Sequence, residues 1–546
     1  MMAVGGYLDV STSSITGSAL KGKNSQHFGV EDGGRQKREM ANEQIDGDNS
    51  GHFIRSQYQE KLALFDQEFM NGQSTSNLSM SSTVTQQTKT FEIETDKRIP
   101  KLGVMLVGLG GNNGATFVAG ILANKLKMDW ETKNGTMSAN FFGSFTQSGT
   151  VHAGYKFNSK SNILEDVHLP VKDLLPMVDP CQFMISGWDI SQANLYESCL
   201  RAKVLEPDLL KQLKGELESI KPLPAAFRGD FIASNQADRA DNVINGTNIE
   251  IITKLREDIR LMKSQCDKVV VLWTANTEMY MLPEIDTMDK LHMMVSKNHE
   301  LPASVLYCMA AIEERVLYLN GSPQNTFHKA IVEYARQKGS FIAGSDFKSG
   351  QTRYKTIMSD FLIGSGIRLS SVVSYNHLGN NDGKNLSEDK CFQSKKISKG
   401  GVLDDAIKSN KILYPEGKDK IDHDVIIRYI PFVGDSKRAI DEYSSQIFMN
   451  GINTIMSYNM CEDSLLAVPL MIDMVILGEL FTRMRVNGEG LGPVLSYLSF
   501  FFKAPITNHS DYVINSYTRQ RESLVNFLKV AAGLPLDSGT MMAFKY

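Results

Sequence analysis

The sequence predicts an α/β protein whose core is a parallel sheet, and three observations lead to this prediction. Between residues 101 and 350, short apolar runs rich in β-branched side chains alternate with stretches of helical pattern, which is typical of parallel strands in βαβ units. Each of these runs ends in small and polar residues. After Arg353 the apolar runs lengthen and alternate with polar residues, which indicates a second α/β layer with one face of its sheet packed on helices.

Five strands are predicted in the first of these regions. They are GVMLVG from Gly103, CQFMIS from Cys181, KVVVLW from Lys268, RVLYLN from Arg315 and SFIAG from Ser340. Because the carboxyl ends of parallel strands meet at one edge of a sheet, we expect the Gly, Asn, Ser and Thr residues that follow these runs to line one crevice. Three longer strands are predicted at residues 368–376, 423–434 and 452–460.

The composition excludes several classes of protein. The chain has 546 residues, of which 42% are hydrophobic, and a formal net charge of −4, so neither a disordered composition nor a general attraction to nucleic acid is present. Its six cysteines include no C-x-x-C pair and no histidine partner at metal-ligand spacing, which argues against a zinc site or a disulfide framework. We therefore expect a reducing compartment, no metal and no nucleic-acid partner.

Neither a secretory signal nor a membrane span is predicted. The first ten residues, MMAVGGYLDV, lack a basic stretch followed by an apolar core. The most apolar run, residues 465–480, contains Pro469, Asp473 and Glu479, and an ion at its centre would be costly in lipid. We expect a buried helix at this position, in a cytoplasmic protein that does not bind membranes.

The first 98 residues are predicted to form a largely mobile arm. Residues 1–50 and 71–90 are rich in Gly, Ser, Asn, Gln and charge, with few apolar side chains to anchor them. The segment FIRSQYQEKLALFDQEFM, from Phe53, is the one piece that we expect to dock as a helix.

A glycine-rich turn predicts a bound dinucleotide. The stretch VMLVGLGGNNGATFVAGILANK places four glycines between a strand and an amphipathic helix, and these are Gly108, Gly110, Gly111 and Gly114. The missing β-carbons let backbone amides approach a pyrophosphate at the helix N-terminus. The spacing G-x-G-G-x-x-G differs from the standard fingerprint, so a tight βα turn without a ligand is the alternative.

An acidic residue for the adenosine ribose should follow this turn. Asp129 lies at the usual distance along the chain, but Asp189 in GWDI is the stronger candidate because it ends the next predicted strand. With no adjacent Arg, NAD is favoured over NADP. Helix N-capping is the alternative role for Asp189.

The segment SDFKSGQT predicts a second anion site. It ends a strand and opens a helix, so the amides of Ser349, Gly350, Gln351 and Thr352 are candidates to bind a substrate phosphate. An ordinary capped helix start is an equally good interpretation of this segment alone.

Four dispersed lysines are candidates for acid–base chemistry, and they are Lys395, Lys399, Lys437 and Lys503. A lysine that is desolvated, or close to other cations, has a lowered pKa and can exchange protons near neutrality. The carboxylates of Asp382, Asp435 and Asp463 lie in similar strand-end loops. Asn376, Asn380 and Asn381 are suited to orienting sugar hydroxyls or to shaping turns. Taken alone, each lysine is better explained as a solvated surface residue.

The strings GLGGNNG, SGWDI, LWTANTE, NGSPQNT, DFKSGQT, SYNHLGNNDG, VGDSK, CEDSLLA and KAP occur in this order. Together they resemble the eukaryotic myo-inositol-1-phosphate synthase family over about residues 102–535. The resemblance implies a Rossmann-type NAD-binding domain interrupted by an α+β catalytic and tetramerisation domain, within a homotetramer. The implied boundaries are an arm at 1–98, an NAD-binding domain at 99–352, a catalytic domain at 353–466 and a returning C-terminal segment at 467–546.

The implied activity is the NAD-dependent isomerisation of D-glucose 6-phosphate to 1L-myo-inositol 1-phosphate. In that family NAD oxidises the C5 hydroxyl, the acidified C6 loses a proton and attacks the C1 aldehyde, and NADH reduces the C5 ketone. Such a route needs an anchored phosphate and cationic donors for a developing oxyanion. We expect Lys395 and Lys399 near the C5 oxygen, and Lys437 on the phosphate. A conventional sugar-phosphate dehydrogenase, or a relative that binds NAD without turnover, is the alternative.

The expected site residues fall into three groups. The catalytic group is Lys395, Lys399, Lys437, Lys503, Asp346, Asp382 and Asp463. The substrate-binding group is Ser349, Gly350, Gln351, Thr352, Asn376 and Asn380. The cofactor-binding group is Gly108, Gly110, Gly111, Asn112, Asn113, Gly114, Asp189, Thr274, Ala275, Asn276, Thr277 and Asp435. The chain departs from the family pattern at Ser345, Arg315, His328, Lys329 and Tyr458.

Overall fold

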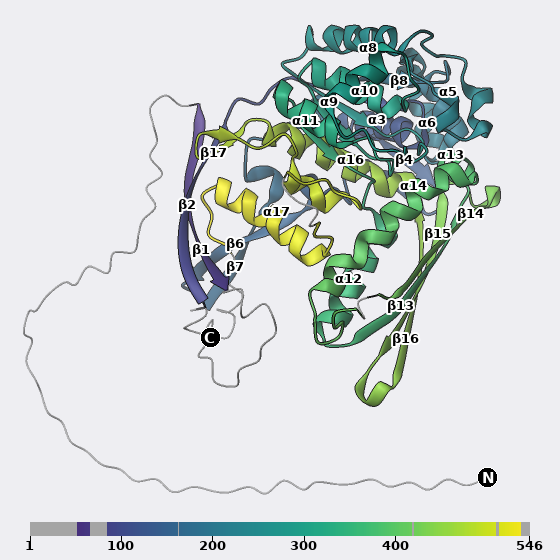
Figure 1. Cartoon of the computed structure of the whole chain (residues 1–546). Helices are drawn as coiled ribbons and strands as arrows, with labels where there is room; N and C mark the ends of the chain where they lie inside the picture. Colours follow the sequence, from purple (N-terminus) through teal and green to yellow (C-terminus); the bar gives the residue numbers. More distant parts are fainter. Residues whose placement is uncertain (1–51, 66–83, 162, 418–419, 509–512, 537–546) are drawn as a thin grey trace, which may run out of the picture. The chain divides into compact units, whose positions relative to one another are not determined.

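The computed structural model describes residues 52–65, 84–161, 163–417, 420–508 and 513–536 (Figure 1). The mobility predicted for residues 1–50 and for most of 71–90 therefore concerns segments outside the described residues. The division of the chain into four domains stays a prediction.

A six-stranded parallel sheet forms the centre of the fold, and the five strands predicted before Arg353 are confirmed. The order is β12 (Ile342–Gly344), β11 (Leu317–Asn320), β10 (Lys268–Trp273), β3 (Leu102–Val107), β8 (Met184–Asp189) and β9 (Leu223–Pro224). Every neighbouring pair is parallel. The carboxyl ends therefore share one edge, as the sequence predicted.

Helices bury both faces of this sheet because the strand residues alternate between two cores. Val104 and Leu106 of β3 pack with α3 (Asn112–Lys125) and α16 (Asp463–Phe481), whereas Met105 and Val107 pack with α8 (Asn248–Lys263) and α10 (Ala303–Glu313). The near-continuous apolar strands of the sequence follow from this two-sided burial.

Helix α16 is the buried helix predicted at residues 465–480. Within the described part of the chain, it is the one helix with the length and composition of a membrane span, but most of it lies inside the protein. Its Asp473 accepts hydrogen bonds from the Ser144 and Thr146 hydroxyls, at 2.6 and 2.7 Å. Its Glu479 pairs with Arg483 at 2.7 Å. The buried charges of Asp473 and Glu479 are therefore satisfied by protein groups.

A four-stranded sheet follows, in the order β14 (Asp422–Tyr429), β13 (Arg368–Leu378), β15 (Ser436–Gln446) and β16 (Ile452–Glu462). The three longer predicted strands are confirmed, and β15 is an additional strand. Helices α12 (Gly350–Gly364) and α14 (Asp389–Gly400) pack beside it (Figure 1). Helix α12 begins shortly after β12, and the later turns of α14 contact Asp346, which follows β12. This packing brings residues of the second region to the carboxyl edge of the first sheet.

The helix predicted from Phe53 is wrong. Residues Phe53–Phe65 form strand β1, which pairs antiparallel with β2 (Val84–Asp96), and β2 in turn pairs with β17 (Met484–Val486). The described end of the arm is therefore an ordered sheet. Ile54 and Tyr58, on one side of β1, pack against the main core. Local helix propensity lost to hydrogen bonding with partner strands that are distant in the sequence.

The remaining elements complete the two layers and their connections. The strands are β4 (Asp129–Thr132), β5 (Gly135–Ser138), β6 (Thr150–Asn158), β7 (Ile163–Pro170) and β18 (Glu489–Gly490). The helices are α4 (Phe145–Ser148), α5 (Leu195–Ala202), α6 (Pro207–Gln212), α7 (Lys214–Ser219), α9 (Met288–Ser296), α11 (Lys329–Lys338), α13 (Asn381–Asn385), α15 (Asp404–Lys408) and α17 (Tyr517–Ala531).

Candidate active site

One pocket collects most of the predicted site residues at the carboxyl edge of the six-stranded sheet. From the expected cofactor group it is lined by Gly108, Gly111, Asn112, Asn113, Asp189, Thr274, Ala275, Asn276 and Thr277. From the expected catalytic and substrate groups it is lined by Asp346, Ser349, Asn380, Asp382, Lys395, Lys399, Lys437, Asp463 and Lys503. The two predicted sites are therefore one continuous space.

Seven predicted residues do not line the pocket, and they are Gly110, Gly114, Gly350, Gln351, Thr352, Asn376 and Asp435. Several of them support residues that do. Gln351 and Asn376 contact Lys399, and Asp435 accepts a hydrogen bond from Asn112 Nδ2 at 3.3 Å.

The glycine turn has no room for side chains at two positions. Gly108 has a φ of +90°, and a Cβ there would lie 2.8 Å from the Cα of Ala275. A Cβ on Gly114 would lie 2.3 Å from the carbonyl oxygen of Gly108. Helix α3 starts directly at this turn, and its N-cap Gly111 makes no side-chain cap hydrogen bond. The turn thus presents backbone and a helix N-terminus to the pocket, which fits a pyrophosphate.

Asp189 ends strand β8 and is buried beside the turn. It accepts hydrogen bonds from the amides of Gly110, at 2.9 Å, and Ser191, at 3.0 Å. Burial raises its pKa against the opposing effect of these bonds and of two arginines. The alternative role as an N-cap is wrong, because the next helix, α5, is capped by Asn194. Asp129 lies on β4 and does not line the pocket.

The sequence missed Arg201 and Arg239, which line the pocket near Asp189. Arg201 donates a hydrogen bond to the carbonyl of Gly110. The expectation that Asp189 has no adjacent Arg holds along the chain but is wrong in space. Neither arginine belongs to a recognisable motif, so their placement depends on α5 and on the loop after β9.

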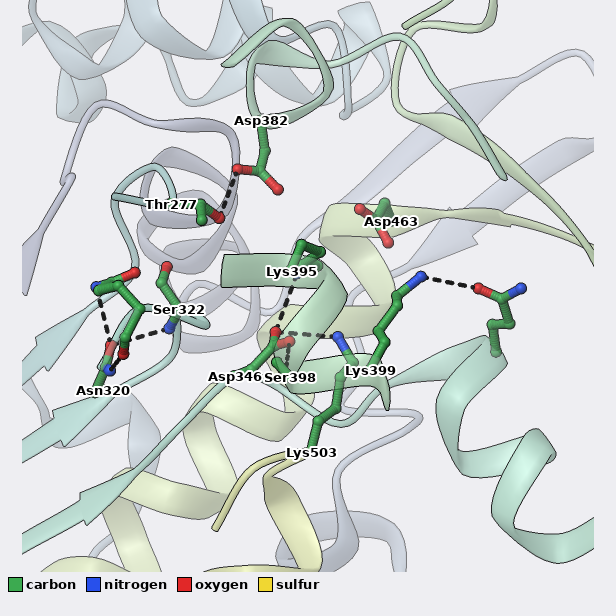
Figure 2. Close-up of polar contacts among 12 residues, drawn as sticks. Thr277, Asn320, Ser322, Asp346, Asp382, Lys395, Ser398, Lys399, Asp463 and Lys503 are labelled. Atoms are coloured by element: carbon green, nitrogen blue, oxygen red, sulfur yellow. Dashed lines mark hydrogen bonds and ion pairs between the residues drawn. The ribbon is translucent and has the colours of Figure 1, made fainter. Parts of the chain in front are cut away.

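Asp346 lies at the centre of a buried cluster of charges (Figure 2). Its Oδ1 is 3.0 Å from Lys395 Nζ and 3.1 Å from Lys503 Nζ, and its Oδ2 accepts a hydrogen bond from Ser398 Oγ at 2.5 Å. Burial alone would raise the pKa of Asp346, but Lys395 and Lys503 outweigh it and hold the pKa well below its usual range. The carboxylate is therefore permanently charged.

The pKa values of the two lysines in this cluster are shifted in opposite directions. Burial lowers the pKa of Lys395, but Asp346 and Asp382 outweigh it, so the pKa lies above its ordinary value. For Lys503, burial prevails over the attraction of Asp346, and with nearby lysines it lowers the pKa to about 8. Lys395 thus stays an ammonium group, whereas Lys503 can exchange a proton near neutrality.

Lys399 points away from Asp346 (Figure 2) and has no carboxylate among its hydrogen-bond partners. Its Nζ is 3.3 Å from Gln351 Oε1 and 3.4 Å from Asn376 Oδ1. Burial, then Lys437, Lys503 and Lys395, hold its pKa well below the ordinary value. Gln351 belongs to the first turn of α12, whose N-cap Ser349 makes no side-chain cap hydrogen bond. A buried, uncompensated lysine therefore lies beside available helix amides.

Polar contacts join the predicted cofactor side of the pocket to the second region. Thr277 donates a hydrogen bond to Asp382 at 3.3 Å, and Asn381 donates to Asn276 at 3.2 Å. Lys437 pairs with Asp463 at 3.3 Å. Asn380 donates to Asp463 at 3.5 Å and to Asp435 at 3.4 Å.

Two of the departures from the family pattern do not line the pocket. Tyr458 is exposed on strand β16, and the buried His328 accepts a hydrogen bond from the Ile285 amide at 3.4 Å. Lys396, on the same helix as Lys395 and Lys399, is exposed. In the described parts of the chain, no group of three His, Cys, Asp or Glu residues is placed to hold a metal ion.

Comparison with known proteins gives a consistent result. A family model described as myo-inositol-1-phosphate synthase matches residues 102–529. An inositol-3-phosphate synthase 1 of Oryza sativa subsp. japonica is 48% identical over 468 residues, which cover 84% of this chain and 91% of the relative. Isozyme 1 of Arabidopsis thaliana is also 48% identical, over 471 residues, with 84% and 91% covered. The crystal structure of inositol-3-phosphate synthase from Caenorhabditis elegans superposes with a TM-score of 0.85 at 43% identity, covering 91% of this chain and 96% of that one.

Proposed function

Because the chain belongs to the myo-inositol-1-phosphate synthase family, we propose that it converts D-glucose 6-phosphate into 1L-myo-inositol 1-phosphate. The observation that carries this proposal is the single pocket in which the glycine turn and Asp189 lie together with Asp346 and four lysines. A reaction that oxidises, cyclises and reduces one bound sugar needs the redox cofactor and the proton-transfer groups in one space.

NAD is the cofactor of the family, and the residues present fit it. The turn at Gly108 and Gly114 excludes side chains and leaves α3 amides for a pyrophosphate, while Asp189 lies at a strand end suited to the ribose hydroxyls. Bound NAD would supply the reversible oxidation of the sugar at C5.

The chain's own residues would hold the sugar and move its protons. We assign removal of the C6 proton to the neutral amine of Lys503, because the lowered pKa of Lys503 makes it a base near neutrality. The Lys395 ammonium, which pairs with Asp346 at 3.0 Å, would stabilise negative charge that develops on the C5 oxygen. Removal of the C6 proton then allows C6 to attack C1 and close the ring.

Lys399 is better suited to the phosphate than to the C5 oxygen, which differs from the division that the sequence favoured. Its Nζ lies 3.3 Å from Gln351, in the first turn of α12, so a phosphate at this helix N-terminus would meet both the amides and the lysine. A dianion would also raise the pKa of Lys399 and restore its charge. Lys437 remains a second candidate for the phosphate.

A homotetramer in the cytoplasm completes the proposal. Four apolar residues on one face of edge strand β16 are largely exposed, namely Ile452 (70%), Met456 (66%), Tyr458 (61%) and Met460 (58%). An exposed apolar edge strand supports burial against another copy. Light scattering on the purified chain tests this: a monomer at micromolar concentration would reject it.

The test of the activity is incubation with glucose 6-phosphate and a catalytic amount of NAD. We expect inositol phosphate to accumulate without net NADH. Stoichiometric NADH with an oxidised sugar phosphate would identify a conventional dehydrogenase instead. The absence of any product from folded protein that binds NAD would reject the enzyme proposal.

A further inference from the structure

Two amide side chains hold Lys399, and each has a fixed orientation. An amide can accept only through its oxygen and donate only through its nitrogen. For Asn376 the nitrogen donates to the carbonyl of Ile426 at 3.3 Å, which turns its oxygen toward Lys399. For Gln351 the nitrogen donates to Asp441 Oδ1 at 2.8 Å, and this bond turns the Gln351 oxygen toward Lys399.

Asp441 is a buried carboxylate outside the pocket. It lies on β15, opposite Ser374 of β13, and its side chain is 2% exposed. Its Oδ1 also accepts a hydrogen bond from Ser374, and its Oδ2 accepts one from Tyr443 at 3.3 Å. Gln351, Ser374 and Tyr443 therefore all donate to Asp441, which suits the acceptor oxygens of a carboxylate.

We propose that Asp441 is a positioning residue of this enzyme, which holds the Gln351 amide with its oxygen toward Lys399 and so sets where the Lys399 amino group lies. This inference rests on the proposed function for its kinetic part. A carboxylate can only accept, so Gln351 has one stable orientation. With a neutral amide in place of Asp441, the reversed Gln351 orientation becomes available, and its NH₂ group would then face Lys399 and repel it.

Asp441 also balances charge behind the phosphate side of the pocket. Lys355, on α12, is buried, and its Nζ lies 3.1 Å from His423 Nε2. Burial lowers the pKa of Lys355 to about 8, and Asp441 opposes this shift. The charged groups that face Lys399 from neighbouring elements are Lys355, Lys395, Lys437 and Lys503. A carboxylate in this position limits the mutual repulsion of these cations.

The test is a double-mutant cycle with Asp441→Asn, Gln351→Met and the double variant, in the full-length chain loaded with NAD. The readouts are KM and kcat for glucose 6-phosphate, and the Kd of inorganic phosphate by calorimetry. We expect Asp441→Asn to raise KM and the phosphate Kd about tenfold, the scale of one hydrogen bond to a charged group, with a smaller change in kcat. In the Gln351→Met background, Asp441→Asn should change KM and the phosphate Kd much less than in the wild type, because most of its effect acts through Gln351.

Tyr443→Phe is the matched control, since it removes a hydrogen bond to the same carboxylate without touching Gln351. We expect its KM and phosphate Kd to equal those of the wild type. Multiplicative effects of the two single variants, or a wild-type KM and phosphate Kd in Asp441→Asn, would overturn the inference. If the wild-type chain makes no inositol phosphate, the proposed function fails, and the phosphate Kd values alone still decide the role of Asp441.

Discussion

The two lysine groups of the pocket are held in different ways. Lys395 and Lys503 contact the carboxylate of Asp346 directly, whereas Lys399 contacts two neutral amides, and the carboxylate of Asp441 lies one residue behind. A direct buried ion pair keeps a charge in place whether or not a ligand is bound. A lysine that contacts only neutral amides becomes more easily protonated when an anionic ligand binds beside it. The first group suits chemistry, and the second suits recognition of an anion.

Among the variants considered, Asp346→Asn should cause the largest loss of turnover. It removes the carboxylate that contacts both Lys395 and Lys503, and breaking a buried pair costs about 3–5 kcal/mol. We expect turnover to fall about 1000-fold, because the pKa of Lys395 loses the support of its main partner. Product formation and NAD binding are measured together.

Asp405→Asn is the control for losing a buried carboxylate. Asp405 accepts a hydrogen bond from the Ser516 amide at 3.0 Å and does not line the pocket, so its variant should lose stability but keep its turnover. Turnover of Asp346→Asn within tenfold of the wild type would remove Asp346 from the mechanism.

Lys399→Ala should weaken substrate binding more than it disturbs the catalytic groups Lys395 and Lys503. We expect kcat/KM to fall roughly 100-fold, as for the loss of one preorganised cationic donor, with the NAD affinity unchanged. Lys396→Ala on the same helix is the matched control, because Lys396 is exposed and its ion pair with Asp424 lies at the surface. Equal kinetics of the two variants would contradict a role for Lys399.

Gly114→Ala tests whether NAD binding at the glycine turn can be weakened without changing phosphate binding at the lysines. The new Cβ would meet the Gly108 carbonyl at 2.3 Å, and overpacking of about 1–3 kcal/mol should weaken NAD binding roughly 30-fold. The phosphate Kd should not change. Gly120→Ala, farther along α3 where a Cβ meets nothing within 4 Å, should bind NAD like the wild type. Equal NAD affinity of both variants would show that the turn does not need its glycine.

The smallest expected effect is the pH dependence of kcat. It tests whether Lys503, rather than Lys399, is the base. The pKa of Lys503 is lowered to about 8, mainly by burial, so its neutral form becomes the major one above about pH 8. If it is the base, kcat should rise about tenfold from about pH 7 to pH 9 and then level off. The NAD affinity measured over the same range serves as the control. A flat profile would exclude Lys503 as the base.

Much of the site could be predicted from the sequence because its residues occur in ordered local motifs. The strand ends at Asp189, Thr274 and Asp346, and the glycine turn, follow from short patterns that local physics dictates. Lys395 and Lys399 belong to the ordered motifs in the same way. They are four residues apart on α14 and so share one side of the helix.

The parallel sheet, the crevice at its edge and the residue types that line it could be read from the sequence, because they depend on periodicity and on neighbours along the chain. Three features depend on the tertiary structure: β1 is a strand, Arg201 and Arg239 approach Asp189, and Asp346 contacts Lys395 and Lys503 while Asp441 reaches Lys399 through Gln351. Each of these depends on contacts between segments far apart in sequence. Hydrogen bonds, ion pairs and burial at such contacts outweigh local propensity, and no local pattern encodes them.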